Sequence, residues 1–295
     1  ATGGQDDFLF RGTFSDDEIT YNGAGLLINA NDGSTVATIQ VGTAAVGGTT
    51  TGVIIEGDDG ADTIDVTPED DVSVIVRGGN NSPGSDELIY RAAGDVTVEL
   101  SNQDVEDAGS AGTRDASWDG IEVVTIDANG NNVLFEGTAQ DDGITVSPMG
   151  PNSLQATVAG SEVLYQFDDV GDFTVDTLGG NDVLTVNGTA DADEIELIQG
   201  RVTITSPSRE AVNYAGVEAL QIMGLGGDDR LTFDNSFGAI APQVLFDGGV
   251  GLDTLWIVGE NDLATVYTVG PEEETGRVEH GETVIEFADL EPIVD

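Results

Sequence analysis

The segment Gly248-Gly-Val-Gly-Leu-Asp-Thr-Leu-Trp256 contains the pattern that decides the fold. A glycine-rich turn is followed by one aspartate and then by apolar residues at alternate positions. Gly57-Asp-Asp-Gly-Ala-Asp-Thr-Ile-Asp65 repeats this order, and Asp229 lies 24 residues before Asp253. A turn that recurs at a fixed spacing before a short apolar run is typical of a solenoid, in which successive coils stack on one another.

The rest of the chain favours strands over helices. It has 41 glycines in 295 residues and short β-branched runs such as Val72-Ser-Val-Ile-Val76, which suit a pleated sheet better than a helix. Asp62 and Asp86 are again 24 residues apart. We therefore predict an all-β fold, a parallel β-solenoid with about 24 residues per coil and roughly 12 coils.

The repeats also predict the domain organisation. Trp118 and Phe287 each begin a similar apolar stretch near the end of a longer repeated unit. We expect one continuous solenoid over residues 1–295, built from a long unit (1–127), a short insert unit (128–177) and a second long unit (178–295).

Charge excludes several classes of function. The chain has 56 acidic residues against 8 basic ones, all arginine, and a formal net charge of −48. With so few cations, binding to nucleic acid through its phosphates is excluded, and no apolar run is long enough for membrane insertion. Self-repulsion of this size calls for compensating cations. Bound Ca²⁺ and a saline habitat both fit, and composition alone does not choose between them.

The turns resemble the hemolysin-type (RTX-like) calcium-binding repeat, whose nonapeptide is G-G-x-G-x-D-x-U-x with U apolar. Gly248 to Trp256 matches each specified position, and Gly57 to Asp65 misses only the second glycine. The resemblance implies Ca²⁺ between turns of neighbouring coils, because Ca²⁺ takes carboxylate and carbonyl oxygens. The metal candidates are Asp62, Asp182, Asp229, Asp253, Asp86, Asp17, Asp142 and Asp193. The alternative is that these aspartates cap the turns by accepting backbone N–H hydrogen bonds.

Both termini begin or end within a repeat. Joining Asp295 to Ala1 of a second copy would place Asp253 and the next Asp6 at 48 residues, twice the repeat spacing. We expect head-to-tail stacking into a homopolymer through open solenoid ends; an excised segment of a longer protein would have the same termini. The expected interface residues are Gly3, Gly4, Asp6, Phe8, Leu9, Phe10, Phe287, Leu290, Ile293 and Asp295.

These features predict a secreted, extracellular or cell-surface structural protein, the subunit of a calcium-associated filament or matrix fibre. A stalk module of a calcium-binding adhesin or surface-layer protein is the alternative, with cell-surface or matrix polysaccharide as a further partner. A polysaccharide-active β-helix enzyme is a remote alternative, since adjacent carboxylates point apart and no catalytic residue is expected. We expect His280 in an exposed loop.

Overall fold

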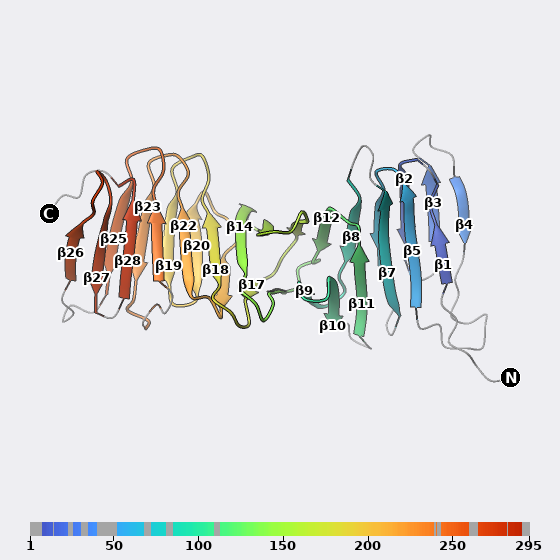
Figure 1. Ribbon diagram of the computed structural model, residues 1–295, viewed down its shortest axis with the longest axis horizontal. Helices are drawn as coiled ribbons and strands as arrows, with labels where there is room; N and C mark the ends of the chain where they lie inside the picture. Colours follow the sequence, from blue (N-terminus) through green and yellow to red (C-terminus); the bar gives the residue numbers. More distant parts are fainter. Residues whose placement is uncertain are drawn as a thin grey trace. The chain divides into compact units, whose positions relative to one another are not determined.

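The computed structural model describes residues 8–13, 15–22, 26–30, 35–39, 52–67, 72–80, 85–108, 113–238, 240, 243–259, 265–281 and 283–290. Within these ranges the chain forms 28 β-strands and no helix (Figure 1). The predicted all-β class is therefore confirmed. Two compact units are present. Unit 1 contains residues 1–135 and 162–171, and unit 2 contains residues 136–161 and 172–295.

Unit 1 is built from strands of two sheets. The first contains, in spatial order, β1 (Phe8–Arg11), β5 (Gly52–Asp59), β7 (Ser73–Asn80), β11 (Thr113–Asp119), β10 (Asp104–Ala108), β9 (Asp95–Glu99) and β13 (Val133–Glu136). The second contains β16 (Leu164–Asp168), β12 (Val123–Asp127), β8 (Glu87–Arg91), β6 (Thr63–Val66), β2 (Asp17–Tyr21), β3 (Leu26–Ala30) and β4 (Thr35–Ile39). Within each sheet, strands from successive turns of the chain pair in parallel, for example β5 with β7 and β6 with β8. The strands of inserted hairpins pair antiparallel.

Unit 2 repeats this arrangement. Its first sheet contains β17 (Phe173–Asp176), β21 (Val212–Ala215), β20 (Arg201–Ser206), β19 (Glu194–Ile198), β23 (Arg230–Asp234) and β25 (Thr254–Val258). Its second sheet contains β15 (Ser153–Val158), β14 (Gly143–Gly150), β18 (Val183–Asn187), β22 (Ala219–Met223), β24 (Gln243–Asp247), β28 (Thr283–Ala288), β27 (Gly276–His280) and β26 (Thr265–Val269). Two sheets of mainly parallel strands are compatible with a β-solenoid.

The strand register shows where the repeat spacing holds. Ile64 pairs with Leu88 and Leu231 pairs with Leu255, each an offset of 24 residues. Other parallel neighbours are farther apart in sequence: Ile19 pairs with Ile64, an offset of 45 residues. The hairpin β3–β4 lies in that longer interval. The 24-residue spacing is thus not uniform, and the predicted number of coils stays a prediction.

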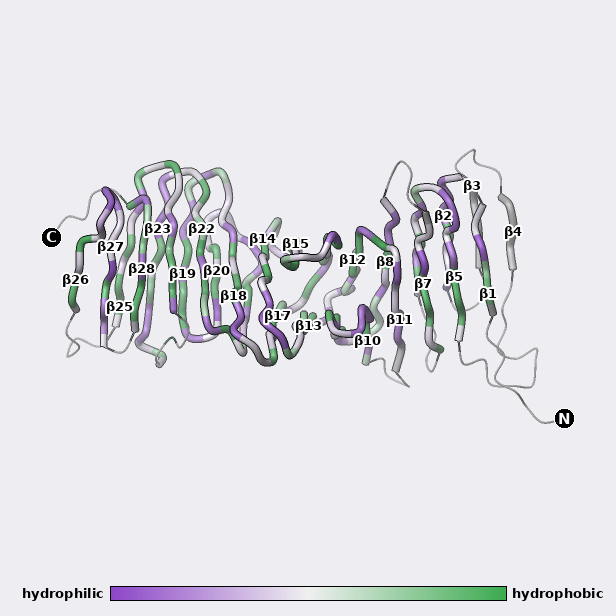
Figure 2. The backbone as a smooth tube through the Cα atoms, in the orientation of Figure 1, coloured by the Kyte–Doolittle hydropathy of each residue, from purple (hydrophilic) through white to green (hydrophobic). Residues whose placement is uncertain are grey.

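Alternation along the strands places the core. In β6, Ile64 and Val66 are fully buried while Thr63 and Asp65 are half-buried, as expected for strands with one face towards an interior. Figure 2 shows hydrophobic and hydrophilic residues alternating along many strands of both units. On the outer face of unit 1, Glu56 forms ion pairs with Arg11 and Arg77. The few arginines of the chain therefore offset local acidic charge.

Candidate functional site

Carboxylates, most of them buried, are stacked at the corners where the chain passes between the two sheets of a unit. In each stack, the backbone N–H of one acidic residue donates to the carboxylate of the next, over 2.7 to 2.9 Å. We call these stacks ladders and their residues rungs. Ladder 1 is Asp17, Asp62, Asp86 and Glu122; ladder 2 is Asp142, Asp182 and Glu218; ladder 3 is Asp193, Asp229 and Asp253. Ladder 1 lies in unit 1 and the other two lie in unit 2.

The first rung of every ladder is satisfied by a threonine four residues earlier. The Thr138 backbone N–H donates to Asp142 Oδ2 over 2.6 Å, and its hydroxyl donates to the same carboxylate. Thr13 and Thr189 make the same contacts with their own rungs. The Gly-Thr copies of the repeat are therefore ladder starts.

Later rungs have an oxygen without such a partner. Oδ2 of Asp62, Asp86, Asp182 and Asp229 is buried and accepts no hydrogen bond in the described structure. In two of these turns, the residue at the position of the ladder-start threonine has a left-handed backbone: φ is 83° at Asp58 and 74° at Leu225. A non-glycine residue in this conformation is strained, so these turns hold strain together with a buried carboxylate.

A glycine before the turn makes room for the carboxylate of Asp62, Asp86 and Asp229, whereas Thr177 occupies this position before Asp182. A methyl group on Gly57 would lie 2.3 Å from Asp62 Oδ2 and 2.6 Å from the Gly78 carbonyl oxygen. A methyl group on Gly224 would lie 2.4 Å both from Asp229 Oδ2 and from the carbonyl oxygen of Gly248. Neither glycine has a positive φ. The requirement for glycine here is therefore steric.

The segment from Gly248 to Trp256 contains three glycines, and each position requires glycine for its own physical reason. Gly248 lies against Asp253 and the Asp289 carbonyl oxygen, and Gly249 has a φ of 87°. A methyl group on Gly251 would lie 1.5 Å from the Gly227 carbonyl oxygen of the neighbouring coil. Close packing of adjacent turns thus accounts for the glycine pattern.

Burial makes these carboxylates weaker acids. It raises the pKa of Asp62 to about 7 against a lowering by the Asp17 N–H, and neighbouring Asp86 and Asp17 raise it further. Burial likewise raises the pKa of Asp229 to about 6 and raises the pKa of Asp86 and Asp193 above the usual aspartate range. A buried carboxylate without a cation disfavours its charged form.

The predicted metal candidates all belong to the three ladders. Each is buried except Asp142, which is half-buried. The rungs are joined through backbone N–H groups, and no cluster of three or more acidic or histidine side chains that could hold a metal occurs among the described residues. The donors that face a ladder turn are one Oδ2 and a glycine carbonyl oxygen. Both are oxygen ligands of the kind that Ca²⁺ takes, but they are two of the 6–8 that it needs.

Sequence reasoning missed the glutamate rungs. Glu122 accepts the Asp86 N–H, and Glu218 accepts the Asp182 N–H. Both follow the same signal, an aromatic residue, one residue, glycine, a β-branched residue and glutamate, beginning at Trp118 and Tyr214. This recurring glutamate could have identified the last rung.

The predicted interface residues have different surroundings. Phe287 and Leu290 are buried in unit 2, and Phe287 belongs to β28, which has strands on both sides. Phe10 is also buried, whereas Leu9 is 52% exposed on the edge strand β1. Gly3, Gly4, Asp6, Ile293 and Asp295 and the Phe8 side chain lie outside the described residues.

His280 is buried in β27, where its Nδ1 lies 2.8 Å from the Thr265 hydroxyl. The expectation of an exposed loop is wrong because the hairpin β26–β27 extends the sheet to this position.

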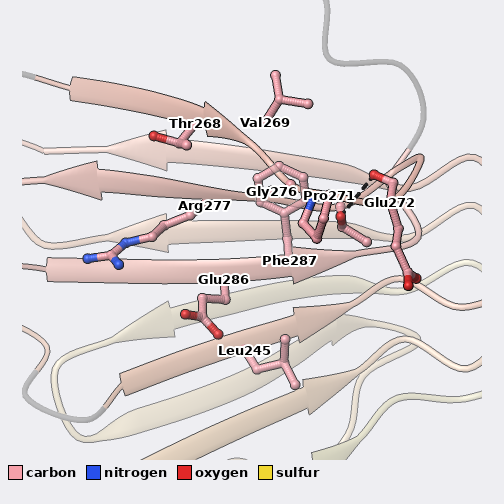
Figure 3. Close-up of a pocket in the computed structure, with 11 residues that line it drawn as sticks. Leu245, Thr268, Val269, Pro271, Glu272, Gly276, Arg277, Glu286 and Phe287 are labelled. Carbon is pink, nitrogen blue, oxygen red and sulfur yellow. Dashed lines mark hydrogen bonds between the residues drawn. The ribbon is translucent and has the colours of Figure 1, made fainter.

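Several exposed apolar side chains lie on the last strands of unit 2. Trp256 of β25 is 53% exposed, and all five residues of β26 are exposed, Val269 at 71%. Beside β26 lies an open hollow of about 520 Å³, in which Thr268, Arg277 and Glu286 come from three adjacent strands (Figure 3). The hollow contains no ladder residue.

The fold and the ladders together define a class, an all-β protein of mainly parallel sheets whose coils are joined at their corners by stacked carboxylates. No known protein family matches the chain, and no curated protein does so either. Among the described residues there is no helix long and apolar enough to cross a membrane.

Proposed function

We propose that this protein is the structural subunit of an extracellular filament or matrix fibre, in which copies stack head to tail. The observation that carries the proposal is the uncovered end of unit 2. Leu231 and Phe233 are fully buried in β23, whereas Leu255 and Ile257, their partners in β25, are only half-buried. A further layer of strands would complete this core.

The use of the repeat residues supports a structural role. Each aspartate of the ladders accepts a backbone or threonine hydrogen bond that joins a turn to itself or to the next coil. Hydrogen bonds to a charged acceptor are among the stronger ones. They stiffen the corners of each unit without requiring a substrate.

Ca²⁺ is the cofactor in this proposal. The buried Oδ2 atoms of Asp62, Asp86 and Asp229 each face a glycine carbonyl oxygen across a turn. A cation there would offset the cost of a buried carboxylate, and binding to the folded state alone would stabilise it. Secretion into a calcium-rich exterior would supply the ion and reduce the self-repulsion of a chain with a charge of −48.

The test is negative-stain electron microscopy of the purified chain in millimolar Ca²⁺ and in excess EGTA. We expect thin filaments with Ca²⁺ and their loss in EGTA. Filaments that persist in EGTA would remove Ca²⁺ from the proposal but leave the filament. Discrete, monodisperse rods in both conditions would contradict the filament.

The second candidate is a stalk module in a calcium-binding adhesin or surface-layer protein, contacting a surface polysaccharide. The same uncovered strands favour it, because a following repeat of a longer chain would cover them equally well. Sedimentation velocity separates the two, since only a self-assembling subunit gives species that grow with concentration.

A further inference from the structure

Two strands form the outermost edges of the second sheets of the units. β4 ends the sheet of unit 1, and β26 ends the sheet of unit 2. Their sequences, Thr35-Val-Ala-Thr-Ile39 and Thr265-Val-Tyr-Thr-Val269, share the order Thr, Val, any residue, Thr and a β-branched residue. The first sheet ends at β1 in unit 1 and at β25 in unit 2. The second sheet continues past these ends, because the hairpins β3–β4 and β26–β27 add strands to it alone.

The two strands match in direction. β4 is separated from β2 by two antiparallel pairings, so it runs the same way as β2 and β6. β26 is separated from β28 by two antiparallel pairings, so it runs the same way as β28 and β24. Each edge can therefore continue its sheet by the parallel pairing that the inner strands use.

Among the described residues, no strand pairs with the outer side of β4 or of β26. The chain has 64 charged residues in 295, yet β4 and β26 contain no charged residue and no proline. Edge strands of soluble proteins are usually blunted by charge, proline or a bulge, because their free N–H and C=O groups are a template for another strand. In a chain with a charge of −48, these uncharged edges are where two copies approach with least repulsion.

The register of both strands places core rows opposite one another. Tyr267 pairs with Val278, which pairs with the buried Ile285. Ala37 pairs with Ile28, which pairs with the buried Ile19. Pairing the two strands in register therefore sets the position of Ala37 beside that of Tyr267.

We infer that β26 of one copy pairs in parallel and in register with β4 of a second copy, with Thr35 opposite Thr265 and Thr38 opposite Thr268. This inference rests on the proposed function and gives the filament a contact between the second sheets of two copies, without covering β25. The exposed Val266, Tyr267 and Val269 are covered in the assembly, and the free backbone groups of both edges become paired.

Engineered cysteines test the register cleanly because the chain contains no cysteine. The full-length variants Thr38→Cys and Thr268→Cys are purified separately, mixed under assembly conditions and oxidised. In-register neighbours would have Cα atoms about 4.8 Å apart, within the range that a disulfide spans. The matched control is Val36→Cys mixed with Thr268→Cys, two residues out of register at about 8 Å.

We expect at least tenfold more disulfide-linked dimer from the in-register mixture than from the control. Equal yields, or no dimer while the wild-type chain forms filaments, would overturn the strand pair and leave the proposed function standing. A wild-type chain that forms no filaments would overturn both.

A second variant does not depend on disulfide chemistry. Thr268→Lys adds a charge to the free edge, and we expect it to abolish filaments while the circular dichroism spectrum stays that of the wild type. Ser208→Lys, at an exposed turn, should assemble normally. Normal filaments from Thr268→Lys would overturn the inference.

Discussion

Two corners of unit 1, at which the chain turns from one sheet to the other, are held by different hydrogen bonds. At the ladder corner, the buried Asp62 accepts the Asp17 N–H, and Gly57 leaves space for the carboxylate. At the corner between β12 and β13, Asn131 stands in the place of Asp62 and donates its side-chain amide to the Ala128 carbonyl oxygen over 2.8 Å. Ala128 stands where the ladder has Gly57 and is fully buried.

The difference lies in whether a carboxylate is buried at the corner. The asparagine corner joins its neighbour through backbone groups, such as the Gly171 N–H that donates to the Asn131 carbonyl oxygen. It buries no carboxylate and accepts a Cβ next to the turn. A ladder corner joins coils through a charged acceptor, which strengthens the contact but requires a proton or cation at the buried oxygen.

The largest expected effect comes from filling the space beside a ladder rung. Gly224→Ala would place a methyl group 2.4 Å from the Gly248 carbonyl oxygen, so backbone must move. We expect a loss of about 3 kcal/mol in the free energy of unfolding, measured by urea denaturation. The control is Gly179→Ala, which has no atom within 4 Å of the added methyl group. An equal loss in both variants would contradict a steric role.

Removing a ladder carboxylate should lower the free energy of unfolding slightly less than Gly224→Ala does. Asp229→Ala leaves the buried Asp193 N–H without its acceptor, and we expect a loss of about 2 kcal/mol. Asp229→Asn keeps an acceptor for that N–H and replaces the second oxygen with a donor facing the Gly248 carbonyl. We therefore expect Asp229→Asn to lie within about 1 kcal/mol of the wild type at pH 8. If Asp229→Asn were less stable than the wild type by more than this amount, the buried charge of Asp229 would be stabilising.

The ladders also predict that stability depends on pH. The pKa of Asp62 is about 7 and that of Asp229 about 6 in the folded protein, against 3.8 as the reference. The folded state then binds more protons than the unfolded state between about pH 4 and 7. The stabilisation is complete below about pH 4 and is lost as pH rises through 7, a decline on the order of several kcal/mol.

Thermal unfolding from pH 4 to 8 checks this dependence. Asp62→Asn should flatten the profile, whereas Asp119→Asn, which removes the same charge from an exposed strand end, should shift the profile without flattening it. Equal profiles for the two variants would mean that net charge, and no particular rung, sets the dependence.

The smallest expected effect tests the other corner. Asn131→Asp removes the amide that donates to the Ala128 carbonyl oxygen and sets a carboxylate oxygen beside that carbonyl. We expect a loss of about 1 kcal/mol at pH 7 in the same urea assay. A gain in stability would show that the asparagine amide is not needed at this corner.

The sequence determined the all-β class, because short β-branched runs between glycine-rich turns bury one face of a strand and cannot form an amphipathic helix of similar length. It also singled out all eight aspartates of the ladders, since their spacing follows the repeat. Only the tertiary structure decided how they are used. Which oxygen of Asp62 accepts the Asp17 N–H, and which stays buried, depends on how the coils stack.

The free edges were likewise set by tertiary contacts. Phe287 looks terminal in the sequence but is covered, because the hairpin β26–β27 adds strands beyond it. Local pattern predicts that a segment is a strand, yet the strand that remains uncovered depends on long-range pairing, which spacing alone does not encode. The turns are therefore a property of the sequence, while the open edge at β26 is a property of the fold.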